Sequence, residues 1–177
     1  MIATTNKERS PAIGLTAQQH RDQIVDAAVH EFAQGGVDGT PAAVIAPRAG
    51  VSQPYLFALF GMKRNLSIAA VKPGSEQMRS VILRAAGEGG EGHDALNAVR
   101  MALLSLRRER MLLPLQLRAF AACADLDVRT VTRARFEKTR RALASACGAP
   151  DRLLRSVLAQ QAMLSVAAAM DLPEAWS

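Results

Sequence analysis

The sequence predicts an all-α fold, with an N-terminal three-helix domain followed by a larger C-terminal helical bundle. Apolar residues recur at a spacing of three to four along the chain, which is the period of an amphipathic helix. The alternation of β-branched residues that marks strands is missing, and aromatic residues make up only 4% of the 177 residues. The abundant alanine, leucine and arginine residues are strong helix formers, and a chain of this length can bury a sizeable core.

The composition is typical of a folded protein without a membrane segment. Charged residues make up 21% of the chain and hydrophobic residues 49%, which is ordinary for a globular domain. No apolar run approaches the roughly 20 residues that a membrane span needs. The N-terminal stretch MIATTNKERSPAIGLTA also lacks the apolar segment of a signal peptide. We therefore expect a cytoplasmic protein with no membrane partner.

The cysteine and histidine residues predict neither a disulfide framework nor a metal site. Cys123 and Cys147 are far apart and form no C-x-x-C pair. His20 and His30 are ten residues apart and fall on different faces of one predicted helix. The sequence also has no nucleophile-base pairing, Gly-rich phosphate loop or metal-ligand spacing. We expect no cofactor and no enzyme activity.

A flexible tail, residues 1–15, is expected before the first helix. Thr16 and Gln19 form a capping box, in which each side chain can accept a hydrogen bond from the other residue's backbone N–H. Apolar residues then line one face of the helix until the glycine pair at 35–36 ends it. The first domain is expected to span residues 16–66.

Two short helices complete the first domain. Thr40 is expected to cap a helix over 41–48 with its hydroxyl, because the proline that follows suits a first helical position, where no N–H is needed. Ser52 caps a third helix that extends to about residue 59.

Residues 67–177 are expected to form the second domain. A fourth helix starts near Lys63, and the Pro-Gly pair at 73–74 should kink or split it before it ends near 87–92. Asp125 or Asp127 caps a long seventh helix. The later helices are expected at 94–108, 112–122, 125–147 and 150–170.

The stretch AGVSQPYLFALF, residues 49–60, joins two short helices over a single glycine. Two helices cross steeply over such a short turn only if the residues at the crossing are small and the turn admits a left-handed backbone. Gly50 meets the second need and Ala46 the first. At 100° per residue, Leu56 and Leu59 fall on the inner side. This spacing is that of a helix-turn-helix, whose second helix lies in the major groove of DNA.

The second helix of this motif presents polar and aromatic residues outward. Gln53 is expected to hydrogen-bond a base edge, and Tyr55 and Phe57 to pack on thymine methyl groups or sugars. Thr40 and Lys63 stand at helix starts, where both dipole and donors favour a phosphate. The candidate DNA-contacting residues are Thr40, Arg48, Ser52, Gln53, Pro54, Tyr55, Phe57 and Lys63.

The net charge of +6 and the isoelectric point near 10.1 suit a polyanionic partner. Residues 1–72 hold seven basic and five acidic residues, a net charge of +2. Most of the excess positive charge therefore lies downstream, in arginine-rich helices. Global charge is weak support for a DNA site in the N-terminal third, because a charged helix face is usually solvated.

Residues 21–66, RDQIVDAAVHEFAQGGVDGTPAAVIAPRAGVSQPYLFALFGMKRNL, resemble the DNA-binding domain of the TetR (tetracycline-repressor-like, TetR/AcrR) family. That family's run places a Phe before a Gly, a Thr before the second helix, I-A-x-x-A-G-V-S, an aromatic-rich helix ending in Phe, and a Lys opening the fourth helix. Here these are Phe32, Gly35 or Gly36, Thr40, Ile45-Ala46, Ala49 to Ser52, Phe60 and Lys63.

The resemblance implies a homodimeric repressor that binds a palindromic operator in double-stranded DNA. The repressor would release the operator when a small molecule enters a pocket in the C-terminal domain. By the same resemblance, Thr40 and Lys63 match phosphate-contacting positions, while Gln53, Pro54 and Tyr55 match base-reading positions.

Five departures from the family's pattern point to weaker DNA binding. Pro41 stands where Ser or Thr is usual, and Pro47 deletes a hydrogen bond inside a helix, at a cost of about 3 kcal/mol in a helix interior. Phe57 replaces a tyrosine whose hydroxyl meets phosphate. Leu59 replaces a frequent histidine, and Met62 replaces a capping serine.

The resemblance also implies that the last helices carry the dimer interface, although an apolar stripe there equally fits an intrachain core. The interface candidates are Leu154, Val157, Leu158, Gln161, Leu164, Ser165 and Ala168. A pocket for a largely apolar effector is expected between the later helices. The ligand candidates are Met101, Leu104, Gln116, Phe120, Cys123, Phe136 and Met163. The stretch RFEKTRRA, residues 135–142, is interpreted as a solvated helix face, with an anionic ligand or a neighbouring phosphate as the alternative use of its positive charge.

Two alternatives to the repressor stay open. One is a family member that still binds ligand and dimerises but has weakened DNA binding. The other is a small all-α enzyme, or an all-α bundle that binds a small molecule and does not bind DNA.

Overall fold

The computed structural model describes residues 16–108 and 111–173, and every regular element in these residues is a helix. The predicted all-α fold, a helix-turn-helix followed by a helical bundle, is confirmed. The flexible tail predicted at 1–15 lies outside the described residues. The α-helices are α1 (Ala17–Gly35), α2 (Ala42–Arg48), α3 (Gln53–Phe60), α4 (Lys63–Gly89), α5 (Gly92–Ser105), α6 (Leu112–Ala121), α7 (Leu126–Cys147) and α8 (Asp151–Ala169).

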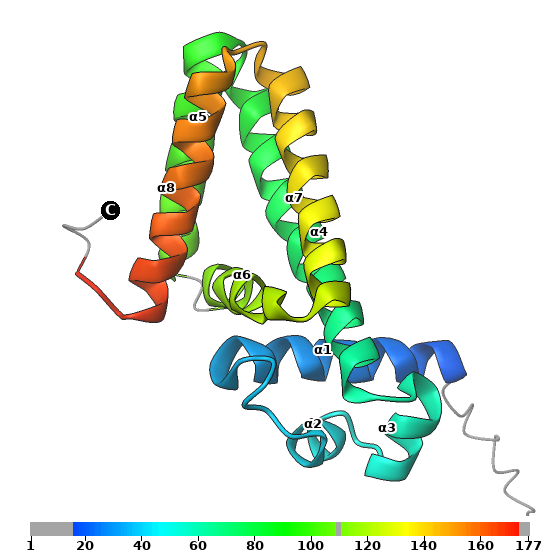
Figure 1. The fold of residues 1–177 in the computed structure, drawn as a ribbon. Helices are drawn as coiled ribbons and strands as arrows, with labels where there is room; N and C mark the ends of the chain where they lie inside the picture. The colour runs from blue at the N-terminus through cyan, green and yellow to red at the C-terminus, as the bar shows by residue number, and fades with distance from the viewer. Residues whose placement is uncertain (1–15, 109–110, 174–177) are drawn as a thin grey trace, which may run out of the picture.

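The helices form two tiers (Figure 1). α1, α2 and α3 make the lower tier, and α4 rises from it with α7 alongside. α5 and α8 stand beside each other at the other side of the upper tier, and α6 crosses between the tiers. None of the described helices is both long and apolar enough to cross a bilayer.

Three of the predicted helix starts are confirmed by their hydrogen bonds. Thr16 Oγ1 accepts from the backbone N–H of Gln19 at 3.2 Å, and Gln19 Oε1 accepts from the N–H of Thr16 at 2.7 Å. Ser52 Oγ accepts from Tyr55 N–H at 3.3 Å. Asp125, rather than Asp127, caps α7, with Oδ1 accepting from two backbone N–H groups at 2.9 and 3.2 Å.

The α2–α3 turn has the backbone that the sequence predicts. Gly50 has φ of +67°, in the left-handed region that glycine enters without steric cost. Val51 N–H then donates to Ala46 O at 3.0 Å, which closes the turn over a small residue. Ile45 of α2 and Leu56 of α3 are fully buried in the same apolar core, which holds α2 and α3 on α1.

The expected role of Thr40 as the cap of α2 is wrong. The N-cap is Pro41, and α2 starts at Ala42 without a side-chain cap. The Thr40 hydroxyl is buried and donates instead to Gly36 O at 2.8 Å, with Glu31 O at 3.3 Å. The C-terminal carbonyls of α1 need donors, so this hydroxyl completes the end of α1 rather than the start of α2.

The predicted split of α4 at the Pro-Gly pair is also wrong, because the helix continues through Pro73 to Gly89. Gly74 is buried against α6, and a Cβ added there would lie 2.5 Å from Leu115 Cδ2. α6 and α7 pack along this helix, and tertiary packing of this kind contributes most of the stability of helices in proteins.

The two tiers have separate apolar cores that α6 joins. The lower core contains Phe32, Leu56 and Leu115, and the upper core contains Leu103 and Leu113. Leu113 and Leu115 are therefore neighbours on α6 that pack into different tiers.

Two arginines make polar contacts across the boundary between the tiers. Arg118 of α6 donates to Gln34 O at 3.4 Å. Arg64, in the first turn of α4, pairs with Asp125 at 2.7 Å and with Asp127 at 3.3 Å. Both α6 and the start of α7 therefore touch the lower tier.

Candidate functional site

The outward side of α3 carries the residues predicted to read DNA. Ser52, Gln53, Pro54 and Tyr55 are exposed, whereas Leu56 is buried in the lower core. Phe57 is half-buried and packs against that core, so only part of its ring is available to a partner. The N-terminal turn of α3 thus presents an amide, a hydroxyl and a phenol together.

Side chains of α1 and α4 hold the C-terminal end of α3. Arg21 donates to Leu59 O at 2.8 Å, and its guanidinium lies over the ring of Phe60, 4.4 Å from the centroid. Asn65 Nδ2 donates to Phe60 O at 2.8 Å. These donors satisfy carbonyls that a helix end leaves without partners, and the arginine charge suits the negative end of the helix.

Tyr55 is held by a ring contact with α1. Its ring meets His20 edge to face, with centroids 5.5 Å apart and an interplanar angle of 82°. Such aromatic pairs contribute about 0.5–1.5 kcal/mol beyond their buried area. The phenol at the outer face of α3 is therefore fixed in direction before any partner binds.

Three of the predicted DNA-contacting residues have partners within the chain. The Thr40 hydroxyl is buried at the end of α1. Arg48 forms a short ion pair with Glu31. Lys63 Nζ donates to Asp38 O at 2.9 Å. Of the three, the side chains of Arg48 and Lys63 reach solvent, so they are the two that can turn toward an approaching anion.

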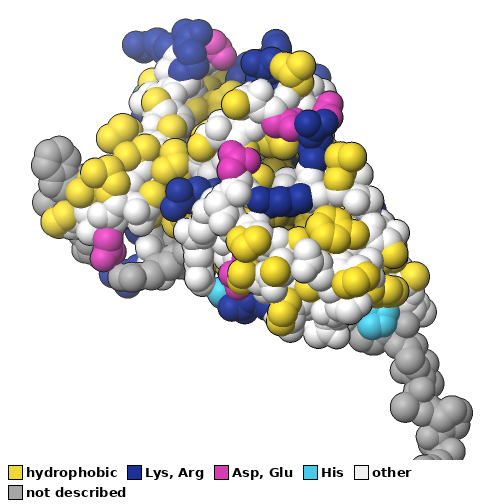
Figure 2. Space-filling view, turned by 60° about the horizontal axis from the view of Figure 1, so that its bottom comes forward, with side chains coloured by type: hydrophobic (Ala, Val, Ile, Leu, Met, Phe, Trp, Pro, Cys, Tyr) yellow, Lys and Arg dark blue, Asp and Glu magenta, His cyan; other side chains and the backbone are white. Residues whose placement is uncertain are grey.

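The face that carries α2 and α3 is apolar between isolated charges (Figure 2). Val44, Tyr55 and Met62 are exposed there, with 44%, 37% and 55% of their surface open to solvent. Bases and sugars offer apolar surface to such side chains, but phosphates do not.

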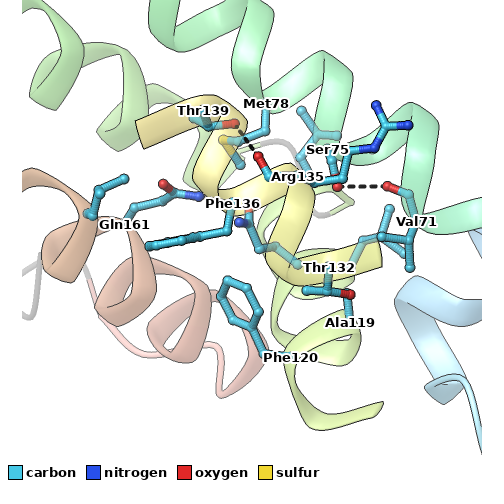
Figure 3. A pocket seen from close by; sticks show the side chains of 15 residues that line it. Val71, Ser75, Met78, Ala119, Phe120, Thr132, Arg135, Phe136, Thr139 and Gln161 are labelled. Atoms are coloured by element: carbon cyan, nitrogen blue, oxygen red, sulfur yellow. Dashed lines mark hydrogen bonds between the residues drawn. The ribbon is translucent and has the colours of Figure 1, made fainter. Parts of the chain in front are cut away.

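A second candidate site lies between α4, α6, α7 and α8, in the upper tier. Its cavity has a volume of about 30 Å³, which holds one or two water molecules. Phe120 and Phe136 meet there edge to face, with centroids 6.5 Å apart. In Figure 3 both rings point into the space between α6, α7 and α8.

The polar groups of this pocket come from four helices. Gln161 of α8 donates to Gln116 of α6 at 2.8 Å, and this hydrogen bond joins the two helices across the pocket. Ser75 and Thr139 donate to the carbonyls one turn before them, at 2.7 and 3.2 Å. Thr132 Oγ1 is buried and has no hydrogen-bond partner among the described residues.

The structure brings three of the seven predicted ligand residues into this pocket: Gln116, Phe120 and Phe136. Met101 and Met163 lie on the surface instead, 66% and 58% exposed. Leu104 packs against the upper core. Cys123, whose thiol donates to Ala119 O at 3.3 Å, is half-buried and does not line the pocket.

Of the wall that α7 supplies, sequence reasoning predicted only Phe136 as a ligand residue. Thr132, Arg135, Phe136 and Thr139 follow a spacing of three, one and three, which places them on one helix face. The interpretation of residues 135–142 as a solvated face is therefore wrong for Arg135, Phe136 and Thr139. The spacing itself was the available signal, but the arginines around it obscured the apolar side.

The stripe predicted as the dimer interface faces the chain's own helices. Leu154, Val157 and Leu164 belong to the upper core, while Leu158 and Gln161 line the pocket. Ser165 is fully buried, and Ala168 packs against the upper core. The structure therefore favours the intrachain alternative for this stripe.

The opposite side of α8 is exposed and mostly apolar. Its members are spaced by three or four residues and so share one face. They are Ala159, Ala162, Met163, Val166, Ala169 and Met170.

Comparison with known proteins agrees with this architecture. Residues 24–70, which run from α1 into α4, match the profile of the family described as bacterial regulatory proteins, tetR family. None of the curated proteins matches the chain.

Solved structures match over most of their length. A TetR-family transcriptional regulator from Rhodococcus sp. is 17% identical, covers 88% of this chain and 91% of its own, and has a TM-score of 0.72. The multidrug binding protein EbrR, solved with imidazole, is 20% identical over 87% of both chains, with a TM-score of 0.70. The fatty acid degradation regulator FadR from Bacillus halodurans is 18% identical, covers 93% of this chain and 88% of its own, and has a TM-score of 0.68.

The helix-turn-helix, its outward recognition helix and the upper bundle form the all-α fold that solved TetR-family transcriptional regulators share. Within that fold, residues 24–70 match the profile of the tetR family.

Proposed function

We propose that the protein is a homodimeric repressor that binds a palindromic operator and releases it when a small molecule enters the pocket between α4, α6, α7 and α8. The observation that carries this proposal is the outward N-terminal turn of α3, held from behind by α1 and α4. The proposal treats residues 16–66 as the DNA-binding domain and residues 67–177 as the effector and dimerisation domain. It assigns the protein no catalytic step.

In this proposal α3 enters the major groove. Gln53 hydrogen-bonds a base edge, and Tyr55 and Pro54 pack against thymine methyl groups or sugars. Arg48 and Lys63 exchange their internal partners for phosphates at the groove's edges. Because each contact replaces an existing one, their net contribution to affinity is smaller than that of a lysine or arginine without a partner.

The dimer is proposed to form through the exposed side of α8. A twofold interface needs one self-complementary patch on each copy, and small residues let two helices approach closely. Ala159, Ala162 and Ala169 supply the small residues, and Met163 and Met170 supply the apolar area. Met163→Glu should therefore shift the protein to monomers in sedimentation equilibrium, while Met101→Glu, at an equally exposed methionine of α5, should not.

Release is proposed to pass through α6 and the start of α7. Leu115 lines the pocket and also belongs to the lower core, so a ligand that moves Leu115 disturbs both. Arg118 and the Arg64–Asp125 pair connect the same helices to α1 and α4. A shift of α6 would thereby change the position of α3 relative to its counterpart in a dimer.

The test is selection of bound duplexes from a random DNA pool at near-physiological salt, with protein of known oligomeric state. Enrichment of a palindrome by the dimer is the expected result. A folded dimer that enriches no sequence would contradict operator binding. That outcome would favour a family member with weakened DNA binding, which Pro47 inside α2 and the internal partners of Thr40, Arg48 and Lys63 make a specific second candidate.

A further inference from the structure

The wall that α7 contributes to the pocket carries a buried hydroxyl without a partner. Thr132 is 6% exposed, and its Oγ1 has no hydrogen bond among the described residues. The hydroxyls of Thr139 and Ser75, in the same pocket, both donate to a carbonyl one turn back. A buried polar atom left unpaired is destabilising, so Thr132 is a donor for which a ligand can supply the acceptor.

Arg135 lies one turn from Thr132 on the same face, and its guanidinium has only a long ion pair with a carboxylate. Its side chain is 25% exposed, and its guanidinium donates no hydrogen bond to the described residues. The nearest carboxylate is that of Glu76, 3.7 Å away, which is an ion-pair distance rather than a hydrogen bond. In Figure 3 the guanidinium of Arg135 lies beside α4, above Val71.

The surroundings of Glu76 contain more positive than negative charge. Glu76 accepts a short hydrogen bond from Arg79 and also lies near Arg135 and Lys138, at 3.7 and 3.8 Å. The hydrogen bond from Arg79, followed by the nearby positive charges, holds the pKa of Glu76 below its usual value. Three cations therefore share one carboxylate, and Arg135 can leave it while Arg79 still satisfies Glu76.

The rest of the wall suits an apolar body and does not suit a cation. Phe120, Phe136, Leu112 and Leu158 supply apolar surface. No aspartate or glutamate is among the described residues that line the pocket. A cationic ligand would lose its hydration without gaining a counter-ion, which is costly in a buried site.

We propose that the effector is a small carboxylic acid with an apolar body. Its carboxylate accepts hydrogen bonds from Thr132 Oγ1 and from the Arg135 guanidinium, and its body packs between Phe120 and Phe136. This inference rests on the proposed function only in treating the pocket as the effector site.

Binding must enlarge the cavity, since about 30 Å³ does not hold such a molecule. The Gln116–Gln161 hydrogen bond and the phenylalanine side chains close the space, and both can rearrange without breaking a helix. The free energy of opening reduces the observed affinity by the fraction of protein in the open state, so we expect dissociation constants in the micromolar range or above.

The test uses three probes with the same body and different head charges: 4-butylbenzoate, 4-butylbenzamide and 4-butylbenzylammonium. Isothermal titration calorimetry on the full-length protein should show the benzoate binding at least about tenfold more tightly than the other two. Equal or tighter binding of the amide or the ammonium compound would overturn the proposal, as would the absence of binding by all three at millimolar concentration.

Variants separate a specific contact from general charge. Arg135→Gln should bring benzoate affinity to within about twofold of amide affinity. Arg140→Gln, on the same helix but outside the pocket and paired with Glu137 and Asp151, should preserve the preference. Thr132→Val should weaken benzoate binding about three- to tenfold, whereas Thr130→Val, at an exposed position of α7, should not. A benzoate preference that survives in Arg135→Gln would contradict the assignment.

Operator release, measured with the selected duplex, distinguishes this inference from the proposed function. If benzoate binds in an Arg135-dependent way but the DNA stays bound, the ligand class stands and ligand release is wrong. If the amide or the ammonium compound releases the DNA and benzoate does not, ligand release stands and the acid assignment is wrong.

Discussion

Three candidate DNA-contacting side chains of the lower tier have partners within the chain, whereas a hydroxyl on the pocket wall of α7 has no hydrogen-bond partner among the described residues. Thr40, Arg48 and Lys63 each contact a carbonyl or carboxylate of the α1 region. Thr132 Oγ1, by contrast, has no acceptor among the described residues, and Arg135 has only a long ion pair with Glu76. The three lower-tier side chains are therefore held without a partner molecule, whereas the pocket wall has donors that a ligand can satisfy.

This difference indicates which polar contacts can contribute free energy to binding. A donor that is already satisfied gains little by changing partner, while an unsatisfied buried donor gains the full difference. DNA affinity should therefore depend on the preformed shape of α3, and effector affinity on a few polar contacts.

The largest expected effect comes from removing the support behind α3. Leu56→Ala deletes a fully buried side chain of the lower core and should lower the free energy of unfolding by about 2–5 kcal/mol. Urea denaturation followed by circular dichroism measures it. Leu126→Ala, at a side chain that is 64% exposed, is the control and should change stability by less than about 0.5 kcal/mol. Similar losses of unfolding free energy for both variants would show that the stability of the lower tier does not depend on its buried core.

A pair of isosteric variants compares the two regions directly. Thr40→Val removes the donor to Gly36 O and should cost about 1–3 kcal/mol. Thr132→Val removes a hydroxyl that has no partner among the described residues, so stability should stay the same or rise. Urea midpoints at an unchanged m-value give both numbers. A larger loss of stability for Thr132→Val than for Thr40→Val would contradict the view that only the Thr40 hydroxyl has a partner within the chain.

DNA binding should separate base reading from phosphate contact. Gln53→Ala should relax the preference at one base position by roughly 1–3 kcal/mol, and Lys63→Ala should weaken binding to all sequences and reduce the salt slope by about 1. Fluorescence anisotropy on specific and random duplexes over a range of salt concentrations measures both. Lys72→Ala, on an exposed part of α4, serves as the control. Equal losses on both duplexes for Gln53→Ala would remove its role in base reading.

The smallest expected effect concerns the cap of α7. Backbone hydrogen bonds from Val128 and Asp127, together with Arg64, lower the pKa of Asp125. A lowered pKa in the folded state stabilises the protein above the carboxyl's usual pKa, and this stabilisation is lost as the pH falls through the lowered value.

Thermal melting between pH 6 and pH 3 tests this effect against Asp125→Asn. The wild-type protein should be slightly more stable at pH 6, and the difference should shrink toward pH 3. A difference that grows on acidification would contradict the assigned role of Asp125.

Local signals predicted those parts of the fold that depend on neighbours in the sequence. Ser52 and Gly50 define their turn within a few residues, and the structure agrees. Thr40 also precedes a helix start, but its hydroxyl donates instead to a carbonyl at the C-terminal end of α1. A hydroxyl between two helices can accept from the N–H groups of the helix that begins or donate to the carbonyls of the helix that ends. Which of these it does depends on how the two helices pack.

The candidate pocket was less accessible to sequence reasoning. Periodicity shows which residues share a face, but not which helix covers that face. For this reason the stripe on α8 fits either a second copy or the chain's own core, and the structure packs α5 and α6 against α8. The pattern around Arg135 is ambiguous for a related reason, since an arginine on a charged helix is usually solvated.

The close packing of Gly74 against Leu115 has a genetic consequence. A single methyl group, introduced by Gly74→Ala, would push the same leucine that a ligand is proposed to move, because only 2.5 Å separates that methyl from Leu115 Cδ2. If the protein releases its operator as proposed, an allele with this substitution would show the effect of the ligand in its absence.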